Sequence, residues 1–331
     1  MNLDKLYAIM EDQPKYRLTQ VKDAIFRLLI TDWNEATNIP KKTRERLSAE
    51  CPLKINGEIF ASKDNKTTKV LITLEDGLQI ETVLLIHKDG RHTVCVSTQV
   101  GCPMGCTFCA TGKLGLKRNL TTGEILDQVL FFSRILKKKD ERVSNIVFMG
   151  MGEPFLNYDN VLSAINYLNK DLGIGARHIS VSTCGVIYGI NKLADLDLQI
   201  NLAISLHAPN QKLRDQLMPV SNHTPLDKLF EAVDNYIAKT GRRVMFEYLM
   251  IKDVNDSVEL AKQLAKLMTK PLYMVNLIAY NPTDVFKPSD KQTIEAFKQV
   301  LEKAGVTFTQ RYSFGQDINA ACGQLANKTS K

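Results

Sequence analysis

The chain has 331 residues, a formal net charge of +7 and 44% hydrophobic residues. These ordinary values predict a globular protein with a sizeable core, and no low-complexity segment or 20–50-residue repeat stands out. The sequence contains no apolar run long enough to span a bilayer and no apolar signal segment near its start, so we expect a cytoplasmic protein. The modest positive charge suits a polyanionic partner, but charge alone does not separate such a protein from an ordinary basic one.

Residues 1–50 are predicted to form a small helical unit. Thr19 is expected to cap a helix, because apolar residues follow it at helical spacing. A second helix is expected after Pro40, and its basic side chains could contact RNA phosphates or simply face solvent, since Glu45 and Glu50 dilute the charge. The apolar positions are Val21, Ile25, Leu28 and Leu29, and the basic ones are Lys41, Lys42, Arg44 and Arg46.

Residues 51–92 are predicted to form a β-meander that extends the main domain. Asp-Gly turns at positions 76–77 and 89–90 separate runs rich in Val, Ile, Leu and Thr. The last strand carries Cys95, which by itself would more often be a small core residue than a reactive one. A two-residue turn at 89–90 would place Glu81 and Cys95 on opposite faces of the sheet, whereas one bulge would reverse that.

Three cysteines follow this strand within eight residues, as Cys102, Cys106 and Cys109 in the spacing C-x3-C-x2-C. A cytosolic thiol cluster indicates a metal site before a disulfide. Structural zinc and a fully ligated 4Fe-4S cluster both take four protein ligands, so three thiolates on a cubane would leave one iron open for a ligand with amine and carboxylate groups. The alternatives are a zinc knuckle with a distant fourth ligand, or three unrelated buried cysteines.

Strand and helix patterns alternate over residues 93–310, and they predict an α/β fold: a partial (β/α)6 barrel with ligands at the carboxyl ends of its strands. Amphipathic helices are expected around residues 125–136 and 161–168. The six expected strands are Thr93–Thr98, Asn145–Met149, His178–Ser182, Leu202–Leu206, Val244–Met250 and Met274–Ile278.

Polar residues and glycines cluster where these strands end. Glu153, in MGMGEP, can accept a hydrogen bond from an ammonium group, and Gly152 allows close backbone approach. Each such residue alone would more often be an ordinary hydrogen-bonding group, so only their joint placement indicates a site. The final segment, residues 311–331, is predicted to be a loop in which small neighbours leave the Cys322 sulfur open. The other strand-end residues are Ser182, Ser205, Leu206, His207 and, in YNP, Asn281.

These motifs resemble the radical S-adenosylmethionine (SAM) enzymes and, more narrowly, the RlmN/Cfr family of RNA adenine methyltransferases. The likeness runs from about Pro14 to Leu325, and its segments are KRNLTTGEI at 117–125, FMGMGEPFLN at 148–157, SLHAPN at 205–210 and DINAACGQL at 317–325. It implies a radical SAM barrel holding one 4Fe-4S cluster on the three loop cysteines, and two SAM molecules consumed per turnover. The residues expected to contact SAM are Gly152, Glu153, Ser182, Ser205, Leu206, His207 and Asn281.

The resemblance also implies an activity, methylation of carbon 2 of an adenosine in 23S rRNA, with some tRNAs as second substrates. Cys322 would carry the methyl group, Cys95 would resolve the intermediate by forming a disulfide with Cys322, and Glu81 is a candidate proton acceptor. An electron donor such as flavodoxin or ferredoxin is expected, and residues 1–50 would be the RNA-binding accessory domain. Nothing suggests a dimer interface, so a monomer is expected.

Two features bear on the position of methylation. Phe314, in RYSFG, matches the carbon-8 enzymes of the Cfr type, which confer antibiotic resistance, whereas Pro154 matches the carbon-2 enzymes; carbon 2 is favoured. More distant alternatives are a radical SAM activase or mutase on another substrate, which would have no use for Cys322, and a zinc-bound RNA-binding module. Cys184 and Cys51 are expected to be packing residues.

Overall fold

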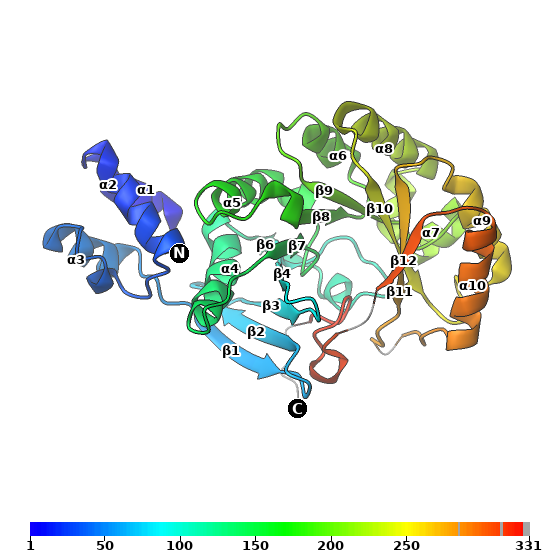
Figure 1. Cartoon of the computed structure of the whole chain (residues 1–331), viewed down its shortest axis with the longest axis horizontal. Coiled ribbons are helices and arrows are strands. Elements are labelled where there is room, and N and C mark those ends of the chain that lie inside the picture. Colours follow the sequence, from blue (N-terminus) through cyan, green and yellow to red (C-terminus); the bar gives the residue numbers. More distant parts are fainter. Residues whose placement is uncertain (284, 312–313, 327–331) are drawn as a thin grey trace.

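The computed structural model describes residues 1–283, 285–311 and 314–326 (Figure 1). Its main body is a ten-stranded sheet in the order β1-β2-β3-β4-β7-β8-β9-β10-β11-β12, and a separate two-stranded sheet pairs β5 with β6. The strands are β1 Asn56–Ala61, β2 Thr67–Thr73, β3 Gln79–Ile86, β4 His92–Cys95, β5 Gln99–Gly101, β6 Leu116–Asn119, β7 Asn145–Phe148, β8 Ile179–Thr183, β9 Asn201–Ser205, β10 Val244–Met250, β11 Tyr273–Ala279 and β12 Phe308–Arg311.

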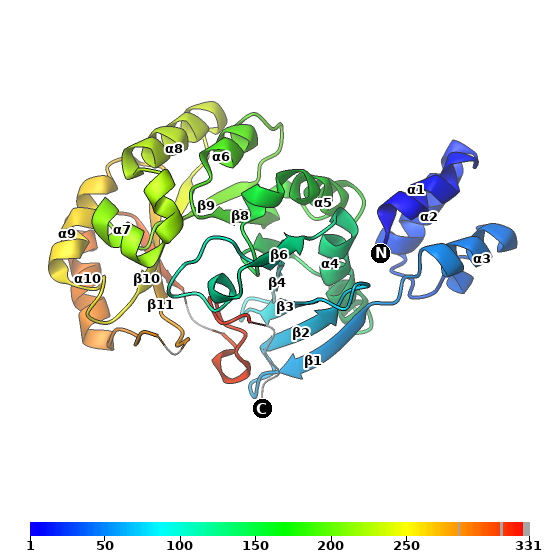
Figure 2. The same ribbon diagram turned by 180° about the vertical axis from the view of Figure 1, so that it is seen from behind.

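Strands β4 and β7 to β12 run parallel, which confirms the predicted α/β fold with a large parallel sheet. The seventh parallel strand, β12, was not predicted, because its four residues are only partly buried and carry no apolar run. The sheet curls so that helices α4, α5, α6, α8, α9 and α10 lie on its outer side, as the two opposite views show (Figures 1 and 2). Helix α7 packs beside the cysteine loop, where the backbone N–H of Thr107 donates to the carbonyl of Leu217 at 2.9 Å. The helices are α1 Leu3–Glu11, α2 Lys15–Lys22, α3 Lys41–Glu50, α4 Thr122–Lys137, α5 Tyr158–Lys170, α6 Ile187–Ala194, α7 Gln211–Leu217, α8 Leu226–Thr240, α9 Val258–Leu267 and α10 Lys291–Lys303.

The predicted apolar stripes of two helices face the core as expected. Helix α4 buries residues at three- and four-residue steps, and α5 does the same, so both pack one face against the sheet. None of the helices in the described ranges has the length and apolar character needed to cross a membrane. The buried stripes are Ile125, Val129, Phe132 and Leu136 in α4, and Val161, Ala164, Ile165 and Leu168 in α5.

The N-terminal unit contains α1, α2 and α3, and the expected helix after Pro40 is confirmed as α3. The expected cap at Thr19 is wrong, because α2 begins at Lys15 directly after Pro14, so Thr19 lies inside it. A π-helical turn then follows at Asp23–Arg27. This wider turn shifts the helical register, and Leu28 consequently becomes 53% exposed instead of joining the core.

The register between β3 and β4 corrects another expectation. Val83 pairs with Cys95, and the backbone N–H of His87 donates to the carbonyl of Arg91 at 2.9 Å, so the turn holds three residues instead of two. Glu81 precedes Val83 by two residues and therefore lies on the same face of the sheet as Cys95. The tight two-residue turn is therefore not formed, and the extra turn residue gives the reversed alternation that was the other expected outcome.

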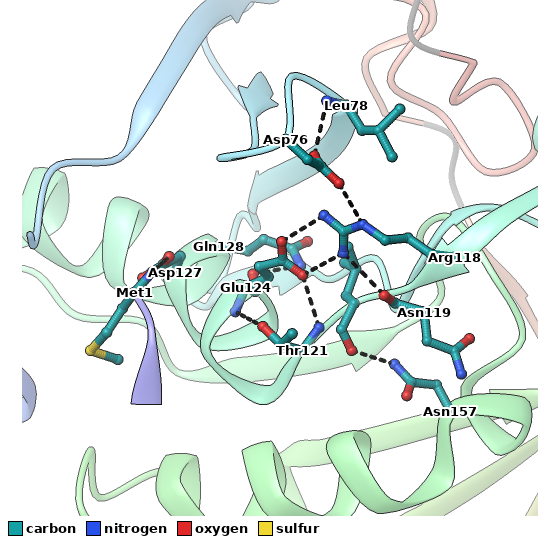
Figure 3. A network of polar contacts seen from close by, with 11 residues as sticks. Met1, Asp76, Leu78, Arg118, Asn119, Thr121, Glu124, Asp127, Gln128 and Asn157 are labelled. Atoms are coloured by element: carbon teal, nitrogen blue, oxygen red, sulfur yellow. Dashed lines mark hydrogen bonds and ion pairs between the residues drawn. The ribbon is translucent and has the colours of Figure 1, made fainter. Parts of the chain in front are cut away.

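Polar contacts of the KRNLTTGEI segment link β6, the first turn of α4 and the turn between β2 and β3 (Figure 3). Arg118, on β6, donates two hydrogen bonds of 2.8 Å to the carboxylate of Glu124 and one of 2.7 Å to Asp76 in the turn between β2 and β3. Thr121 and Glu124 form a capping box at the start of α4. This segment therefore holds β6 against the first turn of α4 and against the meander.

Candidate active site

The three loop cysteines follow β5, and glycine shapes the backbone before them. Gly101 has φ +80°, and a Cβ placed on it would lie 1.8 Å from the carbonyl oxygen of Gly115. The backbone N–H of Cys102 donates to that same oxygen at 3.0 Å. Only glycine therefore allows the chain to close the loop onto β6 and begin the C-x3-C-x2-C segment there.

The thiols of Cys102, Cys106 and Cys109 line one cavity of about 150 Å³, here called the cluster cavity. Within the described ranges, no three His, Cys, Asp or Glu side chains converge closely enough to hold a single metal ion. The donor set nevertheless fits a 4Fe-4S cluster, because each thiolate of a cubane binds a different iron and the thiols must surround a volume. Burial raises the pKa of Cys102 to about 12 and also raises that of Cys109, and bonding to iron would offset this cost of the thiolate form.

Glu153 enters the cluster cavity from the loop after β7. Gly152 before it has φ +103°, and a Cβ there would lie 2.6 Å from Cβ of Gln99, so the close approach requires glycine. The Glu153 carboxylate accepts hydrogen bonds from the backbone N–H groups of Phe155 at 3.1 Å and Cys184 at 2.7 Å. Burial raises its pKa, so a ligand ammonium placed in this cavity would stabilise the ionised carboxylate.

Ser182, Ser205 and His207 line the cluster cavity at the ends of β8 and β9. His207 has φ +56°, and its Nδ1 accepts a hydrogen bond from the backbone N–H of Leu249 at 3.2 Å. Burial lowers its pKa to about 3, so the ring is neutral, carries its proton on Nε2 and can donate that proton's hydrogen bond to a ligand. Leu206 is fully buried and is not one of the described residues that line the cavity; its backbone N–H donates to Glu247.

A second cavity, of about 420 Å³ and here called the thiol cavity, is lined by both Cys95 and Cys322. Cys95 is buried on β4, and burial raises its pKa to about 12, whereas Cys322 is exposed. Cys322 also lines the cluster cavity, so its sulfur-bearing segment lies where the two cavities meet. The fold therefore brings together three features that the sequence placed far apart: the loop cysteines, Cys95 and Cys322.

The C-terminal loop is held in place by hydrogen bonds on both sides of Cys322. The side-chain amide of Asn281 donates to the Cys322 carbonyl at 3.1 Å and accepts from the Gln316 amide at 2.7 Å. The backbone N–H of Ala110, in the cysteine loop, donates to Gly323 at 2.8 Å. Asn281 thus lies at the thiol cavity and is not among the described residues of the cluster cavity. Residues 312–313 and 327–331 of this predicted segment lie outside the described residues.

The Glu81 side chain is buried away from the thiol cavity and the cluster cavity. Its side chain is 1% exposed, its Oε1 lies 2.9 Å from Nζ of the equally buried Lys69, and its Oε2 accepts a hydrogen bond from the backbone N–H of Ala326 at 2.7 Å. It is not one of the described residues that line the two cavities. Its contacts are those of a carboxylate that anchors the end of the C-terminal loop to the meander.

Three site residues were missed by sequence reasoning. Arg311 lines both cavities, and its Nη1 lies 3.5 Å from Oε2 of Glu247, which is itself buried on β10. A charged residue inside the apolar strand VMFEYLM was an available signal for Glu247. Cys184, expected to be a packing residue, lines the cluster cavity, and its Sγ lies 4.0 Å from Sγ of Cys106. Phe314, which the sequence had already marked, lines the thiol cavity and makes an edge contact with the His87 ring, with centroids 5.6 Å apart.

Known proteins resemble this chain over nearly its whole length. Residues 96–265 match the model of the radical SAM superfamily. The chain is 45% identical to a probable dual-specificity RNA methyltransferase RlmN of Dictyoglomus thermophilum, over 95% of this chain and 91% of that protein, and 44% identical to the protein of the same name from Streptococcus pyogenes, over 98% and 93%. A radical SAM methyltransferase from Sphaerobacter thermophilus superposes with a TM-score of 0.94 at 42% identity, covering 99% of this chain and 98% of that one.

Proposed function

Because this chain belongs to the radical SAM superfamily and, within it, to the RlmN family of RNA methyltransferases, we propose that it methylates carbon 2 of an adenosine in 23S rRNA, with tRNA as a second substrate. The observation that carries this proposal is the position of Cys322, which lines both the cluster cavity and the thiol cavity that contains Cys95. A methyl-carrying sulfur at that junction can face SAM on one side and an RNA base on the other.

The chemistry of the target carbon explains why a carrier is needed. Carbon 2 of adenine lies between two ring nitrogens and is electron-poor, so it does not attack the sulfonium methyl group of SAM. A thiolate is a good nucleophile for that methyl group. Cys322 therefore accepts a methyl group from a first SAM, and its thiol proton is lost.

The second stage uses the same S-methyl group. When bound, the reduced 4Fe-4S cluster supplies the electron that cleaves a second SAM to methionine and a 5′-deoxyadenosyl radical. The S-methyl group of Cys322 gives a hydrogen atom to that radical, which becomes 5′-deoxyadenosine, and the resulting methylene radical adds to carbon 2 of the adenine. The adduct then gives the ring proton to a base and one electron to the electron-transfer partner. Cys95 gives up its thiol proton and attacks the Cys322 sulfur, the S–CH2 bond breaks, the released carbon takes up a proton to give methyladenine, and a disulfide remains.

The chain's own residues divide the remaining tasks. Cys102, Cys106 and Cys109 hold the cluster, and the Glu153 carboxylate binds the SAM ammonium group in the cavity they share. His207, as a neutral donor, and the two serines bind the polar groups of SAM, while Asn281 positions the Cys322 segment. Glu81 is a weaker candidate for the proton acceptor than the sequence suggested, because Lys69 and the Ala326 backbone already occupy its carboxylate.

The proposal extends to partners. Residues 1–50 would serve as the RNA-binding accessory unit, although α3 offers less free charge than its sequence suggested. Nε of Arg46 lies 2.8 Å from Oε1 of Glu50, and Nζ of Lys41 lies 3.8 Å from Oε1 of Glu45. The Arg44 guanidinium donates to the backbone carbonyls of Ile39 and Asn34. A cytoplasmic electron donor of the flavodoxin or ferredoxin class would supply electrons to the cluster. The enzyme would act as a monomer.

The test is anaerobic reconstitution with iron and sulfide, reduction, and addition of methyl-labelled SAM and a 23S rRNA fragment. Mass spectrometry of the nucleosides should find 2-methyladenosine, and Cys322→Ala should give none while Cys51→Ala, at a buried cysteine in the N-terminal region, retains it. An 8-methyladenosine product would assign the protein to the carbon-8 class and make Phe314 the informative residue. Cleavage of SAM without any methyladenosine would contradict the RNA substrate.

A further inference from the structure

Cys184 touches the cysteine loop although it lies outside the C-x3-C-x2-C motif. Its Sγ is 4.0 Å from Sγ of Cys106. Its backbone is fixed on both sides, because its N–H donates to Glu153 at 2.7 Å and its carbonyl accepts a hydrogen bond from Nη2 of Arg214 at 2.7 Å. Arg214 is fully buried, so this hydrogen bond ties the backbone of Cys184 to the packed core.

The loop side of this contact is also constrained. Cys106 is buried, and a Cβ on Gly112 would lie 3.0 Å from both the backbone nitrogen and the backbone oxygen of Cys106, so the loop folds tightly over it. Both sulfurs line the cluster cavity, through which a small oxidant can reach them. A disulfide needs the two sulfurs to approach from 4.0 Å to about 2.05 Å.

We propose that Cys106 and Cys184 form a reversible disulfide when an oxidant destroys the cluster. A free Cys106 would otherwise be oxidised stepwise to sulfinic acid, which is irreversible at such a site. With a neighbouring thiol in contact, the first oxidation product condenses to a disulfide instead. Cys106 cannot bind iron in that form, so the pair also delays reassembly of the cluster until a thiol reductant is present.

The chemistry balances with hydrogen peroxide as the oxidant. The Cys106 sulfur attacks one peroxide oxygen, the O–O bond breaks, and a sulfenic acid and one water form. The Cys184 sulfur then attacks the sulfenic sulfur, the S–O bond breaks, and the hydroxyl group leaves with the Cys184 thiol proton as the second water. Two thiols lose two electrons in total, and one peroxide is reduced to two waters. A dithiol such as dithiothreitol reverses the bond by thiol–disulfide exchange.

The test starts from the reconstituted holoenzyme treated with hydrogen peroxide. Free thiols are then blocked with N-ethylmaleimide, the protein is digested without reduction, and linked peptides are mapped by mass spectrometry. The expected product joins the peptides of Cys106 and Cys184. Iron content should return on incubation with iron and sulfide only when dithiothreitol is added. Cys106 linked instead to Cys102, Cys109 or Cys322, or Cys184 recovered as its maleimide adduct, would overturn the proposal.

Two variants sharpen the result. In Cys184→Ser, the same peroxide treatment should convert Cys106 to sulfinic acid, and dithiothreitol should no longer restore iron binding. Cys51→Ser, a substitution at a cysteine whose sulfur contacts the backbone carbonyl of Asn2, should behave like the wild type. Equal recovery of iron in the wild type and Cys184→Ser would also refute the idea. These measurements need no RNA, so their outcome is independent of the proposed methylation.

Discussion

Nζ of Lys69 lies 2.9 Å from Oε1 of Glu81, and each side chain is only 1% exposed. The pair joins β2 to β3, and the other carboxylate oxygen of Glu81 accepts a hydrogen bond from the backbone of Ala326. A buried ion pair links the meander to the end of the loop that carries Cys322. This contact gives Glu81 a structural role whatever its part in proton transfer.

Removing the cation should destabilise the protein strongly. Lys69→Met leaves the buried Glu81 carboxylate without the Lys69 ammonium group, and we expect a loss of about 3–5 kcal/mol in the free energy of unfolding. Urea denaturation followed by circular dichroism measures it. The double variant Lys69→Met, Glu81→Leu should recover most of that loss, because neither charge then remains buried. A single Lys69→Met variant as stable as the wild type would contradict this account.

Cys95→Ala should stop the reaction after carbon–carbon bond formation. The proposed intermediate links Cys322 to the RNA, and Cys95 lines the same thiol cavity. Cys109, the other cysteine among the described lining residues, is assigned to the cluster. We expect a protein–RNA adduct that survives denaturing electrophoresis and is lost after ribonuclease treatment. Cys51→Ala is the matched control and should give no adduct. Normal turnover by Cys95→Ala would rule out resolution by this thiol.

Gly152→Ala should impair SAM binding through the backbone. The new Cβ would lie 2.6 Å from Cβ of Gln99 at a φ of +103°, so the segment must shift and move Glu153 with it. Gly77→Ala has a similar φ of +81° but no atom within 4 Å, so it isolates the cost of the left-handed conformation, roughly 1–2 kcal/mol. Calorimetric titration with SAM should show weaker binding for Gly152→Ala and unchanged binding for Gly77→Ala.

His207 should make the protein less stable at acid pH. Burial lowers its pKa to about 3, against an ordinary value of 6.5, so below pH 6.5 the unfolded chain binds a proton that the folded one excludes. The contribution of neutral His207 to the free energy of unfolding is complete above pH 6.5. It declines by up to about 1.4 kcal/mol per pH unit as the pH falls from there towards 3. His207→Asn keeps a residue that tolerates a left-handed backbone but cannot titrate. Unfolding free energies at pH 5 and pH 7.5 should therefore differ less for this variant than for the wild type.

The spacing of residues close together in the sequence was enough to predict several of the helices. The buried stripes of α4 and α5 and the start of α3 were predicted because helix period and capping are set by residues a few positions apart. The same reasoning failed at Thr19, because the helix begins earlier at Lys15, and at β12, where partial burial leaves no apolar run. One additional turn residue was enough to place Glu81 and Cys95 on the same face.

By itself, the sequence determined the three-cysteine loop and the alternation of strands and helices, because both depend on residues near one another in the chain. It also marked Cys95, Glu153 and Cys322 as candidates by their resemblance to a family. Only the tertiary structure decided that Cys322 lies between two cavities, that Glu247 faces Arg311 and that Cys184 touches Cys106. These contacts join distant segments, and they depend on strand register and on the curl of the whole sheet, which short-range patterns do not encode.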